Sequence, residues 1–237
     1  MNRLLLILRS FIFMVCFYIF SIFFFTIALL TFPLPFHKRY VFISLWCHGV
    51  MWLLKKICRL NYVVQGLNHL PKTPAIIFSN HQSTWETIAF LLIFPPQSWV
   101  LKHELLKIPL FGWCAALLEP IAINRKKRKS AMSQVIELGK KRLEAGRWVV
   151  IFPEGTRVNP RENVPYKKGG AVLAAKSGYP VVPVAHNAGH FWPRKGFLKY
   201  PGTITLIIGT PIETNHQSAN TINTMAQKWI EETKTNL

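Results

Sequence analysis

The stretch NHQSTWE contains two residue types that can move a proton, His81 and Glu86, five positions apart. A neutral histidine can remove a hydroxyl proton near pH 7, and a carboxylate bonded to one ring nitrogen fixes the tautomer that leaves the other nitrogen basic. Residues five apart on one continuous helix lie roughly 140° apart around its axis. The two side chains can therefore meet only if His81 precedes a helix and folds back over its first turn.

Glu86 also has a structural alternative. Ser83 and Glu86 form the pattern S-x-x-E, the capping box, in which the glutamate accepts a hydrogen bond from a backbone N–H at the start of a helix. The spacing favours neither interpretation. Glu86→Gln separates them, because glutamine keeps a capping-competent side chain and removes the charge.

A second polar cluster ends an apolar run and consists of Phe152, Pro153, Glu154, Gly155, Thr156 and Arg157. Proline and glycine break the expected strand, and the turn presents a carboxylate, a hydroxyl and a guanidinium together. Arginine is the side chain that best matches a phosphate, because its planar fork carries several donors. The alternative is an ordinary polar turn with a solvated arginine, and turn chemistry taken alone favours it.

Two apolar segments precede these motifs. Residues 10–32 contain no charge, and as a helix they would extend roughly 34 Å, enough for the hydrocarbon core of a bilayer. A cleaved signal peptide is the alternative, but the apolar run is longer than usual and no small-residue cleavage site follows it. Residues 41–54 follow a turn at Pro33 and Pro35. They are too few to span comfortably, so we expect them at the membrane interface.

The charge balance predicts an anionic partner, because 29 Lys and Arg stand against 10 Asp and Glu, a net charge of +19. Basic residues at 37–39 and 55–59 outweigh Arg3 and Arg9, so the positive-inside rule assigns the rest of the chain to the cytoplasm. A re-entrant hairpin with both ends cytoplasmic fits equally well. We expect the basic run 124–129 to press the domain against anionic membrane lipids. No nucleic-acid-binding motif occurs, so nucleic acid is not an expected partner.

Beyond about residue 60, short β-branched runs alternate with longer helical stretches, which is typical of an α/β domain. The expected strands are 61–66, 75–79, 98–102, 120–124, 147–152, 181–185 and 203–209. The expected helices are 83–94, 130–145, 169–177 and 218–233, with Gly146 and Gly178 just past two of their ends. We therefore predict a mostly parallel or mixed sheet flanked by helices in residues 60–237, preceded by a membrane-associated helical segment or hairpin in residues 1–59.

Taken together, NHQSTWE and FPEGTR resemble the glycerolipid acyltransferase family, in particular its bacterial 1-acylglycerol-3-phosphate acyltransferases. Two further blocks match, IAINRKKR with Arg125 and VVPVAHNAG with Pro183. A third stretch, LKHELLKIPLFGW with Lys102, resembles a segment common in the bacterial members. The resemblance covers residues 60 to 210, and it implies an acyl-site or structural role for Pro183.

The resemblance implies transfer of a fatty acyl group from acyl-CoA or acyl carrier protein to the 2-hydroxyl of lysophosphatidic acid, which gives phosphatidic acid. The site of this reaction would be the cytoplasmic face of the bacterial inner membrane. The resemblance also implies that His81 is the general base and Glu86 its orienting acid, with Arg125, Arg157 and Lys102 on the substrate phosphate. Glu86 departs from the family pattern, in which the partner is usually aspartate, one methylene shorter.

Other chemistries find less support in the residues. A thioester is already activated, and no G-x-S-x-G nucleophile elbow occurs. The histidines form no HExxH pattern and the four cysteines no CxxC pair, so we expect neither a metal nor a cofactor besides the acyl-donor co-substrate. Two alternatives stay open, an acyltransferase for another lysolipid such as lyso-ornithine lipid and a non-catalytic basic membrane adaptor. The acyl donor, the chain-length preference and the oligomeric state also stay open.

Overall fold

The computed structural model describes residues 2–124 and 128–237, and seven strands in this part of the chain form one sheet in the order β1-β7-β6-β2-β5-β3-β4. The strands are β1 (Leu60–Gln65), β2 (Ile76–Ser79), β3 (Gln97–Lys102), β4 (Ile121–Ile123), β5 (Trp148–Ile151), β6 (Val181–His186) and β7 (Gly202–Ile208). Neighbouring strands are parallel except β6 and β7. The predicted mixed sheet is confirmed, and each predicted strand is present.

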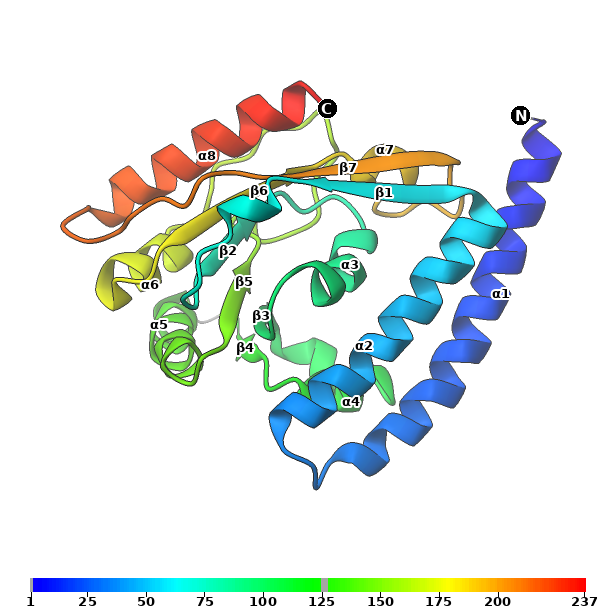
Figure 1. Cartoon of the computed structure of the whole chain (residues 1–237), viewed down its shortest axis with the longest axis horizontal. Coiled ribbons are helices and arrows are strands. Elements are labelled where there is room, and N and C mark those ends of the chain that lie inside the picture. Colours follow the sequence, from blue (N-terminus) through cyan, green and yellow to red (C-terminus); the bar gives the residue numbers. More distant parts are fainter. Residues whose placement is uncertain (1, 125–127) are drawn as a thin grey trace.

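Helices cover both faces of the sheet (Figure 1). They are α3 (Trp85–Ile93), α4 (Phe111–Leu117), α5 (Arg128–Glu144), α6 (Gly169–Ser177), α7 (Ala188–Phe191) and α8 (Ala219–Thr235). Helices α5, α6 and α8 pack on one face, where β2 contributes Ile76 and Phe78. Helix α3 packs on the other face, where β2 contributes Ile77. This alternation follows from the two-residue period of a strand, and burial on both faces explains the continuous apolar runs.

A helical hairpin precedes the sheet and lies against the face that carries α3 (Figure 1). It consists of α1 (Arg3–Ala28), the 3-10 turn η1 (Leu29–Thr31), α2 (Phe36–Leu53) and the π-helical turn η2 (Leu54–Cys58). Both helices are long and apolar enough to cross a membrane. The second apolar segment, expected over residues 41–54, forms a longer helix in the structure. The helix begins directly after Pro35, and the basic residues 37–39 lie in its first turns.

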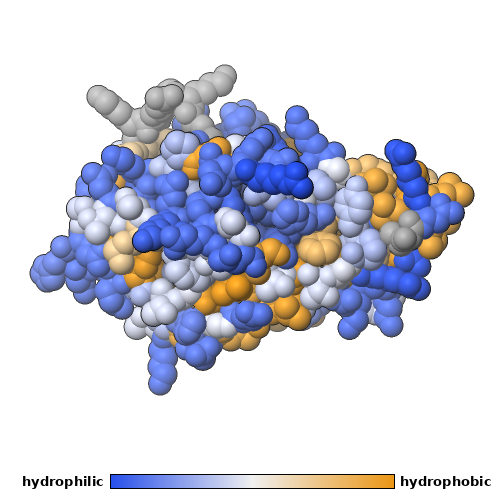
Figure 2. Space-filling view, turned by 90° about the horizontal axis from the view of Figure 1, so that it is seen from above, coloured by the Kyte–Doolittle hydropathy of each residue, from blue (hydrophilic) through white to orange (hydrophobic). Residues whose placement is uncertain are grey.

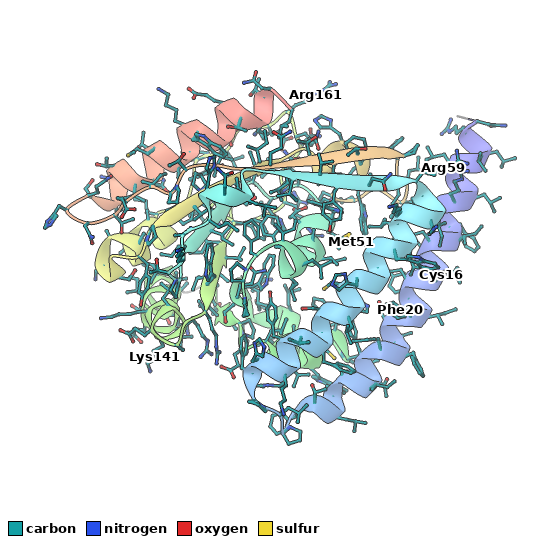
Figure 3. All side chains as sticks on the ribbon, viewed as in Figure 1. Cys16, Phe20, Met51, Arg59, Lys141 and Arg161 are labelled. Carbon is teal, nitrogen blue, oxygen red and sulfur yellow. The ribbon has the colours of Figure 1, made fainter. Side chains whose placement is uncertain are left out.

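One face of α1 packs against α2 and the α/β domain, and the opposite face is exposed and apolar. Gly49 of α2 allows the close approach, since a Cβ at this position would meet the ring of Phe20, which Figure 3 labels on α1. At the tip of the hairpin Leu30 is 77% and Phe32 74% exposed. In Figure 2 apolar colour gathers at the end of the molecule where α1 begins, next to a largely hydrophilic surface. Such a face is suited to lipid rather than water.

Candidate active site

His81 lies in the turn between β2 and α3, at the carboxyl end of a buried strand. Its Nδ1 lies 2.9 Å from Oε1 of Glu86, which is in the first turn of α3. The Glu86 side chain is fully buried, whereas the His81 side chain is 16% exposed. The histidine precedes the helix, as the spacing requires, so the two side chains meet although they are five positions apart.

Glu86 also accepts hydrogen bonds from the backbone at the start of α3. Its Oε1 accepts hydrogen bonds from the N–H groups of Gln82 (2.9 Å) and Ser83 (2.7 Å), in addition to the bond with His81. Oγ of Ser83 accepts a bond of 3.1 Å from the N–H of Trp85. One carboxylate thus helps to cap the helix and contacts the histidine at the same time.

The charge on Glu86 determines the tautomer of His81. Burial raises the pKa of Glu86, but His186, His81 and the N–H of Ser83 together hold it below its ordinary value. An ionised carboxylate can only accept, so Nδ1 of His81 carries the proton and Nε2 carries the lone pair. In the neutral imidazole this arrangement leaves Nε2, beside the cavity that His81 lines, able to accept a proton.

The loop after β5 holds His81 from a second side. The ring of Phe152 stacks on the imidazole, with centroids 4.0 Å apart and planes 9° from parallel. Oε2 of Glu154 accepts a bond from the N–H of His81 (3.0 Å), and the N–H of Val158 donates to the carbonyl of His81 (2.7 Å). The two sequence motifs therefore form one unit, because β2 and β5 are neighbours in the sheet.

Gly155 and Glu154 shape this loop. Gly155 has φ of +75°, which L side chains rarely adopt, and a Cβ at this position would collide with the side chain of Lys167. Burial raises the pKa of Glu154 to about 8, against the opposing effect of its bond with His81. A carboxyl group with this pKa is mostly neutral at pH 7, so the loop adds little negative charge beside His81.

Arg157 is half-buried and lines the same cavity as His81. Its carbonyl accepts a hydrogen bond from the guanidinium of Arg194, which also lines the cavity. Burial lowers the pKa of Arg157 and the charge of Glu86 opposes this effect. Since an arginine in a protein stays protonated, the cavity that His81 lines also has a fixed positive charge.

The other predicted site residues lie in different places. Lys102 ends β3, forms an ion pair of 3.4 Å with Glu104 and lines the cavity, as does the exposed Thr156. Pro183 is buried within β6, and among the described residues it is not one that lines the cavity. Arg125 lies outside the described residues.

The cavity has a volume of about 1450 Å³ and extends from the polar groups to the helical hairpin. Its walls away from His81 are mainly apolar, with Phe25 from α1, Trp46 from α2, Leu91 from α3 and Cys114 from α4. This size is above the range of ordinary small-molecule pockets. The arrangement can hold a long apolar group with an anionic end and remove a proton where the two meet.

A protein-family model described as Acyltransferase matches residues 61–187, more than half of the chain. The chain belongs to the acyltransferase family. This acyltransferase is 45% identical over 204 residues to the 1-acyl-sn-glycerol-3-phosphate acyltransferase of Pseudomonas aeruginosa, across 84% of this chain and 79% of that protein. It is 34% identical to the protein of the same name from Saccharomyces cerevisiae, across 74% of this chain and 59% of that protein.

A solved structure has the same fold as this acyltransferase. The 1-acyl-sn-glycerophosphate acyltransferase of Thermotoga maritima matches with a TM-score of 0.82 at 23% identity, and the match covers 100% of this chain and 97% of that chain. The hairpin and the sheet therefore belong to one shared architecture.

The sequence did not assign a place beside His81 and Glu86 to two buried residues, Asn80 and His186. Asn80 precedes the base in the chain, and His186 ends β6, next to β2 in the sheet. The sequence signal for His186 was its position directly after the expected strand 181–185. Its closeness to Glu86 depends on the strand order, which the sequence did not indicate. Within residues 2–124 and 128–237, no group of three His, Cys, Asp or Glu side chains is placed to hold a metal ion.

Proposed function

We propose that this acyltransferase transfers a fatty acyl group from a thioester to the 2-hydroxyl of 1-acylglycerol 3-phosphate and so makes phosphatidic acid. The main support is the shared cavity, in which the basic nitrogen of His81 and the cation of Arg157 accompany a long apolar volume. A lysophosphatidic acid needs these three features, since it carries a hydroxyl, a phosphate and an acyl chain. The names of the relatives from Pseudomonas aeruginosa and Saccharomyces cerevisiae agree with this substrate.

In the proposed reaction Nε2 of His81 takes the proton of the 2-hydroxyl while the oxygen attacks the thioester carbonyl. The C–O bond forms first, and the C–S bond then breaks as the tetrahedral intermediate collapses. The departing thiolate takes the proton from the imidazolium, so His81 returns to its neutral form. A positioned base of this kind contributes roughly 10²–10⁴-fold to the rate, and Glu86 stabilises the imidazolium that forms.

We propose Arg157 as the main ligand of the substrate phosphate, with Lys102 and Arg125 as further cations. Arg157 is carried by the loop that also holds the base, so the phosphate and the hydroxyl of one substrate would be positioned by one unit. Lys102 forms an ion pair with Glu104, so we expect it to contribute less to phosphate binding.

We propose that residues 1–59 anchor the protein in the bacterial inner membrane and that residues 60–237 form the catalytic domain on its cytoplasmic side. The two apolar helices and the positive charge flanking α2 support this orientation. The cavity continues to the hairpin, so a lipid substrate and a lipid product would exchange with the bilayer at this place.

The test is an acceptor and donor panel on membranes that contain the full chain. We expect phosphatidic acid from lysophosphatidic acid with acyl-CoA or with acyl carrier protein, and the comparison identifies the donor. A panel in which only lyso-ornithine lipid or another phosphate-free lysolipid is acylated would replace the proposed acceptor. The absence of acylation with each acceptor and donor would leave the non-catalytic adaptor as the better account.

A further inference from the structure

His186 faces the carboxylate oxygen of Glu86 that His81 does not contact. Its Nε2 lies 4.0 Å from Oε2 of Glu86, and both side chains are fully buried. Within the described part of the chain Oε2 of Glu86 has no hydrogen-bond partner. A distance of 4.0 Å exceeds a hydrogen bond, but electrostatic interactions remain strong at this range away from water.

The hydrogen bonds of His186 determine where its proton lies. Nε2 lies 3.0 Å from the carbonyl oxygen of Asn80, which can only accept, so Nε2 carries the proton. Nδ1 accepts a bond of 3.3 Å from the N–H of Ala188. These two bonds require the neutral Nε2–H tautomer, and burial lowers the pKa of His186 and favours the same form. The N–H of a neutral ring therefore points its positive end toward Asn80 and Glu86.

The backbone of His186 is held independently of its ring. The side-chain amide of Asn80 donates to the carbonyl of His186 (2.8 Å) and accepts from its N–H (3.1 Å). This clamp joins the carboxyl ends of β2 and β6, which are neighbours in the sheet (Figure 1). The rings of Trp85 and Phe90 from α3 pack edge to face against the imidazole, at centroid distances of 6.0 Å and 6.2 Å. Replacing the ring thus leaves the clamp itself in place.

We propose that His186 is a positioning residue for the base: the positive end of its Nε2–H, which is donated to Asn80, attracts the second oxygen of Glu86 and so keeps the carboxylate aligned with Nδ1 of His81. The inference rests on the proposed function and extends its machinery from a pair to the series His81, Glu86 and His186. A glutamate is one methylene longer than an aspartate, and in this chain its Oε2 lies 4.0 Å from Nε2 of His186.

The contact between His186 and Glu86 matters because His81 becomes positively charged in the proposed reaction. Glu86 is surrounded by His81 from its own turn, by His186 from β6, and by Arg157 and Glu154 from the loop after β5. When the donor on His186 is removed, the carboxylate loses stabilisation and the coupled His81–Glu86 pair binds a proton more readily. The acidic limb of the pH profile of kcat/KM then moves to higher pH, because only the pair with a neutral His81 and an ionised Glu86 is active.

The test uses the full-length protein in membranes and compares two substitutions of one residue. His186→Leu removes the N–H donor, whereas His186→Gln keeps one at a similar distance from the backbone. We expect His186→Leu to lower kcat roughly 10- to 100-fold with little change in the KM for lysophosphatidic acid, the usual cost of losing a residue that orients a functional one. We expect His186→Gln to recover most of this loss.

His190→Leu is the matched control, since this histidine lies four positions further on and is exposed. Wild-type kcat and an unmoved acidic limb in His186→Leu would overturn the proposal. So would a folded His186→Gln protein that is as slow as His186→Leu, because the loss would then follow the ring shape and not the donor. Failure of the wild type to acylate lysophosphatidic acid would count against the proposed function itself, which separates the two outcomes.

Discussion

At the residue scale, Glu86 joins the helix start to the histidine through a single oxygen atom. Oε1 accepts from Nδ1 of His81 and from the N–H groups of Gln82 and Ser83. Three donors on one buried acceptor stabilise its negative charge, and that charge in turn selects the tautomer of His81. The Glu86 side chain therefore supports the start of helix α3 and also selects the tautomer of His81.

Glu86→Gln tests which contribution depends on charge. The amide oxygen can still accept the two backbone bonds, so we expect the variant to fold, with a melting temperature in detergent close to that of the wild type. The neutral side chain no longer stabilises an imidazolium, so we expect kcat to fall at least roughly 10-fold. Steady-state kinetics and thermal unfolding of the same preparation measure both effects. An unchanged kcat would show that Glu86 serves the backbone alone.

Glu154→Gln tests the raised pKa of a buried carboxyl group. Burial brings its folded-state pKa to about 8, above the value in the unfolded chain, so the folded state binds more protons between the two values. The stabilisation is complete below the unfolded pKa and is lost as the pH rises through about 8. We expect the wild type to lose stability relative to Glu154→Gln from pH 5 to pH 8, by about 1.4 kcal/mol per pH unit at most. The prediction would be contradicted if the melting temperatures of the wild type and of Glu154→Gln changed by the same amount across this pH range.

At the scale of elements, the hairpin depends on the close packing of α1 and α2 at Gly49. A Cβ at this position would lie 2.6 Å from the ring of Phe20. We expect Gly49→Val to destabilise the protein by about 1–3 kcal/mol through overpacking, and Phe20→Leu to restore part of the loss. Gly169→Ala is the control, since a Cβ at that position meets no atom within 4 Å. Equal melting temperatures for Gly49→Val and Gly169→Ala would contradict the packing argument.

Most elements could be predicted because strands buried on both faces read as short apolar runs, and amphipathic helices carry a clear period. Gly146 and Gly178 do adopt the left-handed conformation expected after a helix. Helix α4 was not predicted, because Pro109 and Gly112 in its neighbourhood read as breaks. The antiparallel pairing of β7 with β6 depends on long-range strand order that local patterns do not encode. The same holds for the pairing of β6 with β2, which brings His186 near Glu86.

At the scale of the whole molecule, two polar contacts stand out among those that join the hairpin to the α/β domain. One is an ion-pair network in which Glu119 binds Arg39 of α2, Arg142 of α5 and Arg147, which directly precedes β5. The other is the buried Lys199, whose N–H donates to Ser10 of α1 at 2.9 Å. Such contacts hold the apolar wall formed by the hairpin in a fixed place relative to His81.

Glu119→Gln tests the first of these contacts. Three arginines would lose their shared carboxylate, so we expect the variant to lose about 1–3 kcal/mol of stability. High salt should reduce the difference from the wild type. Glu144→Gln is the control, because it removes only an exposed pair of 3.7 Å with Lys140 and should cost less than about 0.5 kcal/mol. Similar losses in both variants would mean that the network does not join the two parts.

The most direct test of the account is the rate of phosphatidic acid formation by His81→Ala. The full chain is expressed in membranes, supplied with lysophosphatidic acid and the acyl thioester that the wild type uses, and compared with His190→Leu at equal amounts of folded protein. We predict a loss of kcat of at least roughly 10²-fold in His81→Ala and wild-type turnover in His190→Leu. Turnover by His81→Ala at the wild-type rate would contradict the assignment of the base and the mechanism built on it.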